Sequence, residues 1–174
     1  MKKQNVLLIV LVMMVAAGNV TADEGHHAAT AGSKELERVK TLAGRWEGTT
    51  QHGTGAQEPA AVEYKVTSGG SAVIETLFPG TPHEMVSVYH DEGDKLAMTH
   101  YCMLGNQPRL QLISSTDKQL ELSLAPDSGI GATEQHMHAV TLAWTDANHL
   151  TQAWSGYQDG KPHETTTITL SRVQ

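Results

Sequence analysis

The sequence predicts an all-β domain, an antiparallel up-and-down β-barrel of about ten strands with a short N-terminal helix. After Gly44 nearly every segment is rich in Val, Ile, Thr and Tyr, and several segments alternate apolar with polar residues. Turn signals such as "SGGS", "FPGTP" and "STDK" separate these segments at short intervals. Parallel crossovers need a dozen or more residues, so the strands must meander. A meander leaves two exposed edges unless the sheet closes, and a two-sheet sandwich is the alternative.

The first 22 residues predict a secretory signal peptide. Two lysines precede an apolar run at residues 6–17, which is shorter than the roughly 20 residues of a membrane span. Val20 and Ala22 occupy the small-residue positions of a cleavage site that would release a chain beginning at Asp23. We expect export to the periplasm or the cell exterior, with no stable membrane anchor after cleavage. An uncleaved anchor helix is the alternative.

The remaining chain divides into a leader and one domain. Residues 23–32, "DEGHHAATAG", are small and polar without periodicity and predict a disordered leader. Residues 33–174 predict the barrel domain, which is long enough to bury a core. Ser33 is the expected N-cap of the helix. The apolar stripe of this helix consists of Leu36, Val39 and Leu42.

The charge balance disfavours two classes of partner, and the cysteine count indicates where stability comes from. The chain has 19 acidic and 12 basic residues, and loss of the signal peptide removes two of the lysines. The mature charge of about −9, without a Lys/Arg cluster, disfavours nucleic acid and anionic lipid as partners. The only cysteine, Cys102, cannot form an intramolecular disulfide, so stability must come from the core. The sequence does not predict an oligomeric state.

A short motif adds a family resemblance to this fold class. The stretch "LAGRWEG", residues 42–48, follows the predicted helix and resembles the calycin group of lipocalins, fatty-acid-binding proteins and nitrobindin-like barrels. It is also similar to uncharacterised exported bacterial proteins of that fold. The resemblance implies that Trp46 plugs the closed end of the barrel. It further implies that Arg172, on the last strand, packs across the Trp46 ring in a cation–π contact, so that both residues are structural.

Alternation along the strands predicts a ligand site near the open end. Barrels of this size can hold a small ligand, and inward-facing side chains contact it. The stretch "THYCMLGNQPRL", residues 99–110, is expected to form a hairpin at the rim, where His100 and Arg109 offer hydrogen-bond donors. We therefore expect a mostly apolar small molecule with a polar head group. The predicted ligand contacts are Met85, Met98, His100, Cys102, Arg109, His136, His138, Gln152 and Trp154.

Metal and haem are weaker alternatives. His136 and His138 are two residues apart on one strand and would share a side, but a zinc site needs a third ligand, from His100 or His149. The spacing supplies none, so no metal site is predicted. The nitrobindin likeness implies haem held by a histidine late in the chain, and His149 and His163 are the candidates. The cofactor is therefore left open.

The sequence favours a binding protein over an enzyme. It contains no nucleophile elbow, no phosphate loop and no paired carboxylates on one strand face. Cys102 and His100 are the one pair of residues that could act as a catalytic dyad, and no sequence feature supplies an oxyanion hole. A further alternative is a barrel with a filled interior that only contacts another envelope protein.

Overall fold

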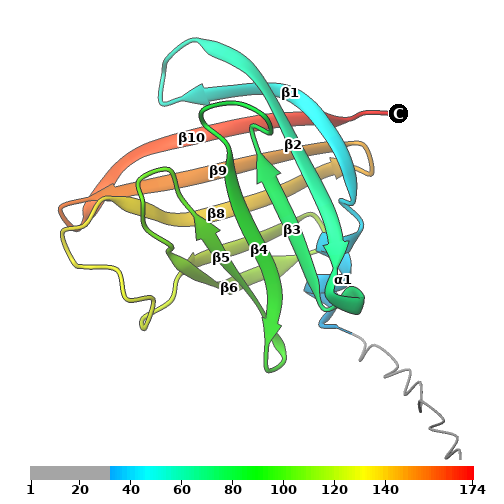
Figure 1. Ribbon diagram of the computed structural model, residues 1–174, viewed down its shortest axis with the longest axis horizontal. Helices are drawn as coiled ribbons and strands as arrows, with labels where there is room; N and C mark the ends of the chain where they lie inside the picture. The colour runs from blue at the N-terminus through cyan, green and yellow to red at the C-terminus, as the bar shows by residue number, and fades with distance from the viewer. Residues whose placement is uncertain (1–31) are drawn as a thin grey trace, which may run out of the picture.

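The structure, a computed structural model, describes residues 32–174. The predicted signal peptide and all but the last residue of the predicted leader lie outside the described residues. Ten antiparallel strands close into a barrel in the order β1-β10-β9-β8-β7-β6-β5-β4-β3-β2 (Figure 1). The predicted up-and-down barrel is confirmed, and the sandwich alternative is wrong because β1 pairs with both β2 and β10.

The number of strands matches the expectation of about ten. They are β1 (Gly44–His52), β2 (Gln57–Thr67), β3 (Ala72–Leu77), β4 (Met85–Glu92), β5 (Lys95–Tyr101), β6 (Arg109–Thr116), β7 (Gln119–Leu124), β8 (His136–Asp146), β9 (His149–Gln158) and β10 (Lys161–Arg172). A short 3-10 turn, η1 (Ser68–Gly70), joins β2 to β3. Closure needs a small residue in β1, because a Cβ at Gly48 would lie 1.9 Å from the backbone oxygen of Thr169.

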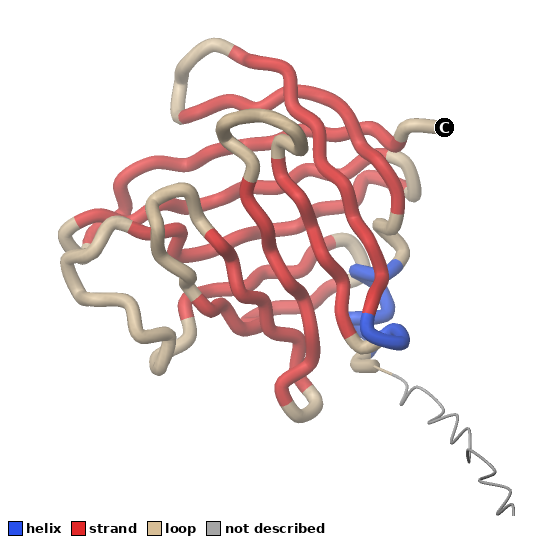
Figure 2. The backbone as a smooth tube through the Cα atoms, viewed as in Figure 1, coloured by secondary structure: helices blue, strands red, loops and turns tan. Residues whose placement is uncertain are grey.

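The single helix in the described residues, α1 (Lys34–Lys40), lies at one end of the barrel (Figure 2). The Ser33 hydroxyl accepts a hydrogen bond from the Leu36 backbone N–H at 3.1 Å, which confirms the predicted N-cap. The helix ends at Lys40, with Thr41 as C-cap. Leu36, Val39 and Leu42 are fully buried, so the helix closes this end of the barrel.

Trp46 and Arg172 complete the closed end as the family resemblance implies. Trp46 is 0% exposed, and its indole Nε1 donates to the Leu42 carbonyl at 2.8 Å. The Arg172 guanidinium carbon lies 4.3 Å from the Trp46 ring centroid. The same guanidinium donates to the carbonyls of Thr41 and Ala43 at 2.7 and 2.8 Å, and so ties the last strand to the end of the helix.

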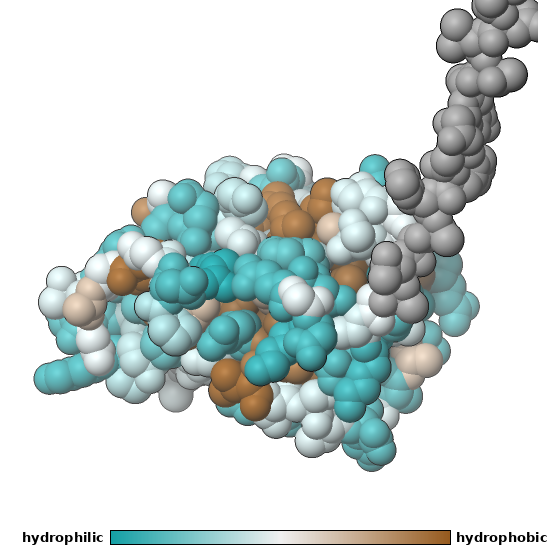
Figure 3. Space-filling view, turned by 90° about the horizontal axis from the view of Figure 1, so that it is seen from below, coloured by the Kyte–Doolittle hydropathy of each residue, from teal (hydrophilic) through white to brown (hydrophobic). Residues whose placement is uncertain are grey.

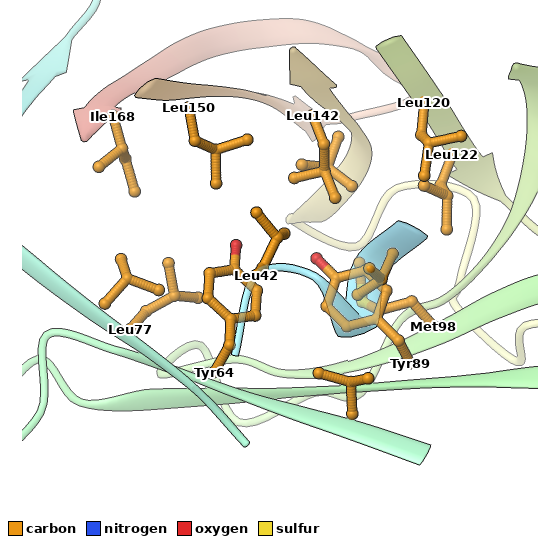
Figure 4. Close-up of a cluster of buried hydrophobic side chains, with 14 of the residues drawn as sticks. Leu42, Tyr64, Leu77, Tyr89, Met98, Leu120, Leu122, Leu142, Leu150 and Ile168 are labelled. Carbon is orange, nitrogen blue, oxygen red and sulfur yellow. The ribbon is translucent and has the colours of Figure 1, made fainter. Parts of the chain in front are cut away.

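The core fills the barrel interior next to this closed end (Figure 4). Its largest fully buried side chains, apart from Trp46 and Tyr89, are leucines and one methionine. The side chains of Tyr64 and Tyr89 extend inward among the leucines, with their hydroxyl groups directed into the interior (Figure 4). The barrel thus encloses polar atoms within an otherwise apolar core.

The face seen in Figure 3 is largely hydrophilic, with small, separate hydrophobic areas. Within residues 32–174, no helix has the length and apolar character that crossing a membrane requires.

Candidate functional site

A cavity of about 380 Å³ lies at the end of the barrel opposite α1, and we call it the mouth cavity. It is formed where β1, β3 and β5 end and where β2, β4 and β10 begin. Its apolar wall consists of Pro59, Leu77, Phe78, Met85, Met103, Leu104, Met137, Trp154 and Ile168, beside Cys102. Methionines are adaptable contacts, so this wall suits an apolar ligand whose shape the barrel need not match closely.

The polar residues of the mouth cavity carry no positive charge when the histidines are neutral. They are Thr50, His52, Thr81, His83, His100, Gln135 and Thr166, with the acidic residues Glu58 and Glu164. No Lys or Arg lines the cavity within the described part of the chain. His52 is bonded to Thr166, with Nδ1 2.9 Å from the hydroxyl oxygen. The charge around the entrance is therefore negative.

A row of polar residues crosses four neighbouring strands and leads to this cavity. Tyr64 of β2 is the register partner of Glu75 in β3, and Glu75 is the partner of Ser87 in β4. Ser87 is in turn the partner of His100 in β5. All four side chains are buried, so the row runs through the interior from the core to the mouth.

Glu75 is the centre of this row. It is 0% exposed, and no salt bridge pairs it with a cation in residues 32–174. Its Oε1 accepts from the Tyr64 hydroxyl at 2.7 Å and from Gln152 Nε2 at 2.6 Å, and its Oε2 accepts from the Tyr89 hydroxyl at 3.1 Å. Each of the two carboxylate oxygens therefore accepts at least one hydrogen bond.

The ionisation of this cluster follows from burial and hydrogen bonding. Burial raises the pKa of Glu75 above its ordinary value, and the hydrogen bonds that its carboxylate accepts act in the opposite direction. Burial, followed by the charge of Glu75, raises the pKa values of Tyr64 and Tyr89 well above the ordinary value. Both phenols therefore remain protonated donors, which is the state that an ionised Glu75 needs.

The amide of Gln152 is oriented by Trp154. The indole N–H of Trp154 can only donate, and it lies 2.9 Å from Gln152 Oε1. The amide nitrogen of Gln152 must then face Tyr64 and Glu75, at 2.5 and 2.6 Å. This arrangement leaves no conflict between donors around Glu75.

His100 ends the row at the mouth cavity. Its ring nitrogen Nδ1 lies 3.1 Å from the Ser87 hydroxyl oxygen, and its ring centroid lies 4.7 Å from that of Trp154. The side chain is 1% exposed, yet Nε2 has no hydrogen-bond partner. Burial lowers the pKa of His100 to about 4, so the ring is neutral near pH 7. Thr50 Oγ1 is a second buried polar atom of this cavity without a partner.

The structure brings together four of the nine predicted contacts. Met85, His100, Cys102 and Trp154 line the mouth cavity. Met98 and Gln152 face the interior as expected but lie deeper, in the packed core and the Glu75 cluster. Whether any of these residues contacts a ligand stays a prediction.

Arg109 lies at the start of β6. Its guanidinium forms ion pairs with Glu92, at 2.6 Å, and with Asp127, and it does not line the mouth cavity. The neighbouring residue, Leu110, enters the core, as alternation predicts, and the contact of Arg109 with a ligand stays a prediction. Alternation then places Arg109 on the outer face.

His136 and His138 do not line the mouth cavity either. The register of β8 shifts between Met137 and Ala139, and this β-bulge places an extra residue in the strand. The shift reverses the alternation, so Met137 lines the mouth cavity. His136 Nε2 contacts His138 Nδ1 at 3.1 Å, and His138 stacks on Tyr157 with ring centroids 3.8 Å apart. His138 lines a separate, polar groove on the outer surface instead.

The residues that the structure describes provide no set of ligands for the metal and haem alternatives. Within the described residues, no three His, Cys, Asp or Glu side chains form a group that could hold a metal ion. His149 is exposed and pairs with Asp146, and His163 lies on the outer groove. Neither late histidine faces the mouth cavity.

The cysteine does not form a catalytic dyad in this geometry. Cys102 and His100 both line the mouth cavity, but no hydrogen bond joins their side chains among residues 32–174. Burial raises the pKa of the Cys102 thiol, and backbone N–H groups of the following turn oppose the rise. The thiol is therefore not activated as a nucleophile.

Sequence reasoning missed the Glu75 cluster. The signal was present in "AVIETL", where Glu75 shares a strand face with two apolar residues, Val73 and Leu77. Tyr64 likewise shares a face with Val62. An acidic residue on an inward face indicates a buried polar network, because an unpaired buried charge is too costly to keep.

Comparisons with known proteins support the fold. No protein-family model matches the sequence, and no curated protein matches it. Among solved structures, a protein of unknown function from the DUF3598 family of Nostoc punctiforme is similar, with a TM-score of 0.55 and 13% identity over 78% of this chain and 49% of that chain. The chain thus spans about half the length of that protein. A redesigned β-barrel matches with a TM-score of 0.39 and 12% identity over 78% of this chain and 95% of that one.

Proposed function

We propose that the protein is an exported small-molecule-binding barrel that holds a mostly apolar ligand in the mouth cavity. The observation that carries the proposal is the unpartnered Nε2 of His100, a side chain that is 1% exposed and lines that cavity. Leaving a buried polar atom without a partner costs free energy, and a bound molecule would remove that cost.

The size and lining of the cavity fit this role. Ligand sites commonly enclose about 300–1,000 Å³ and combine apolar walls with a few convergent polar groups. The mouth cavity, at about 380 Å³, lies at the small end of that range. The proposal of a filled barrel that only contacts another protein is less well supported, because that role leaves His100 and Thr50 unexplained.

Binding of an apolar fluorescent probe tests the site. We expect wild-type protein to bind the probe with saturation, and Met85→Trp to abolish binding because the larger side chain fills the mouth cavity. The matched control is Val86→Trp, at the next residue of β4 and outside the cavity lining, which should bind like the wild type. The absence of saturable binding to wild-type protein, or unchanged binding to Met85→Trp, would contradict the proposal.

Native mass spectrometry of protein purified from its own host tests the biological form of the proposal. A retained small molecule supports ligand binding, and the mass of a chain beginning at Asp23 supports export. Addition of hemin to the pure protein separates haem from other ligands, since a bound haem gives a Soret band. No band is expected from the late histidines that the nitrobindin likeness implies, because neither His149 nor His163 faces the cavity.

A further inference from the structure

Phe78, the only phenylalanine of the chain, has a backbone conformation that a bulky residue rarely adopts. Its φ is 54°, in the left-handed region that favours glycine, so the side chain is strained there. The other non-glycine residues with positive φ are Ser68 and Asp159, which are small polar residues at turns. Among residues 32–174, Phe78 is therefore the one bulky side chain held in this way.

The conformation of Phe78 brings its ring to the mouth cavity. Leu77, the last residue of β3, is buried and lines the cavity, so simple alternation would place Phe78 on the outer face. Phe78 nevertheless lines the mouth cavity and packs against the core. The departure from extended backbone at Phe78 thus places two consecutive apolar side chains on one wall of the cavity.

Hydrogen bonds hold this conformation from both sides. The Phe78 backbone N–H donates to the Ala61 carbonyl of β2 at 2.9 Å. The Phe78 carbonyl accepts from the Thr81 backbone N–H at 3.2 Å and from the Thr81 hydroxyl at 2.8 Å. In the same loop, the Glu84 carboxylate accepts from the Gly80 N–H at 2.5 Å. Backbone strain persists only where the surroundings impose it, and these bonds do so at Phe78.

Strain of this kind concentrates at functional sites, where the conformation serves binding or catalysis. Glycine adopts the same φ without strain, so the fold alone does not require phenylalanine at this position. The Phe78 ring is half-buried, and part of its surface faces the mouth cavity, where an apolar ligand would cover it. Covering that surface removes apolar area from water and stabilises the complex.

We propose that Phe78 determines the affinity of the mouth cavity for apolar ligands, and that its strained conformation positions the ring for binding at a cost in stability. This inference rests on the proposed function. It concerns the apolar part of the ligand, which packs against the Phe78 ring beside Leu77.

Phe78→Gly and Phe78→Ala separate binding from strain. Both variants remove the ring, so titration with the neutral probe N-phenyl-1-naphthylamine should give an affinity at least about tenfold below that of wild type. Only glycine also relieves the strain, so the Tm of Phe78→Gly should be about 3 °C above that of Phe78→Ala. At an unstrained position the order would be reversed, because glycine loses more conformational entropy on folding than alanine does.

Leu112→Ala is the matched control. Leu112 is another half-buried apolar residue that packs against the core, and it does not line the mouth cavity. This variant should lose stability but bind the probe within about twofold of wild type. A loss of affinity equal to that of the Phe78 variants would overturn the assignment, because any weakening of the core would then impair binding.

The outcomes separate this inference from the proposed function. If wild-type protein does not bind the probe with saturation, the proposed function fails. If wild type binds it and both Phe78 variants bind it equally well, the inference is overturned while ligand binding stands. A Tm of Phe78→Gly at or below that of Phe78→Ala overturns the role of strain. Failure of Phe78→Gly to fold would also overturn the inference, because the ring would then be a requirement of the fold.

Discussion

Ser87 Oγ lies 3.1 Å from His100 Nδ1 in the barrel interior, and this contact joins the buried Glu75 cluster to the mouth cavity. Ser87→Ala removes the hydrogen-bond partner of the buried His100 Nδ1. An unpaired buried group costs about 1–3 kcal/mol, so the free energy of unfolding should fall by that amount in urea denaturation. The control is Ser115→Ala, exposed on β6, with an expected change within about 0.5 kcal/mol. Equal stability of the two variants would show that the contact contributes nothing.

Glu75→Gln tests whether the central carboxyl is ionised. The amide replaces an acceptor oxygen with an NH₂ donor and sets it against donors such as Tyr64 and Tyr89. We expect a loss of about 2–4 kcal/mol in the free energy of unfolding. Glu63→Gln, at an exposed ion pair with Arg45, should cost no more than about 1 kcal/mol. A Glu75→Gln protein as stable as wild type would indicate a carboxyl that is already protonated.

Arg172→Lys tests whether the closed end of the barrel contributes to stability without affecting ligand binding at the other end. Lysine keeps the charge but loses the planar group that donates to Thr41 and Ala43 together and lies over Trp46. We expect a loss of about 1–2 kcal/mol in thermal or urea unfolding. Probe affinity should stay within about twofold of wild type, because the cavity lies at the other end. A large change in probe affinity together with unchanged stability would contradict this separation of stability from binding.

The stability of the protein should depend on pH through the titration of His100. In the unfolded chain the ring binds a proton near its ordinary pKa of 6.5, whereas burial holds the folded pKa at about 4. Protons therefore bind preferentially to the unfolded state between these values, and stability present above pH 6.5 is lost as the pH falls toward 4. The shift corresponds to about 3 kcal/mol.

The comparison protein for this measurement is His100→Asn, which does not titrate at position 100. The raised pKa of Glu75 acts in the opposite sense, since it withdraws stability as the pH rises, and it is present in both proteins. The difference between their unfolding free energies therefore isolates His100. A constant difference between pH 7 and pH 4 would show that the ring is accessible to protons in the folded state.

Local sequence patterns were sufficient to predict the barrel and its closed end. Strand alternation and short turns predict the ten strands, and the contact between Trp46 and Arg172 follows the family resemblance. The mouth cavity was predicted in part, through Met85, His100, Cys102 and Trp154. All of these features depend on short stretches of sequence or on the simple alternation of a strand.

Features that depend on register between strands were not predictable. The row from Tyr64 to His100 requires four strands to align, and no single strand records that alignment. The bulge at His138 adds one residue without a Gly or Pro to indicate it, so simple alternation gives the wrong face. The ion partners of Arg109 lie on other elements, 17 and 18 residues away.

The response of the His100 ring to ligand is the most direct test of the account. Long-range ¹H–¹⁵N NMR spectra of the histidine side chains report the state of each ring nitrogen. We expect His100 to be neutral near pH 7, and its Nε2 resonance to shift when the apolar fluorescent probe saturates the protein. An Nε2 resonance that stays unchanged at saturation would contradict the account, because the probe would then bind outside the mouth cavity.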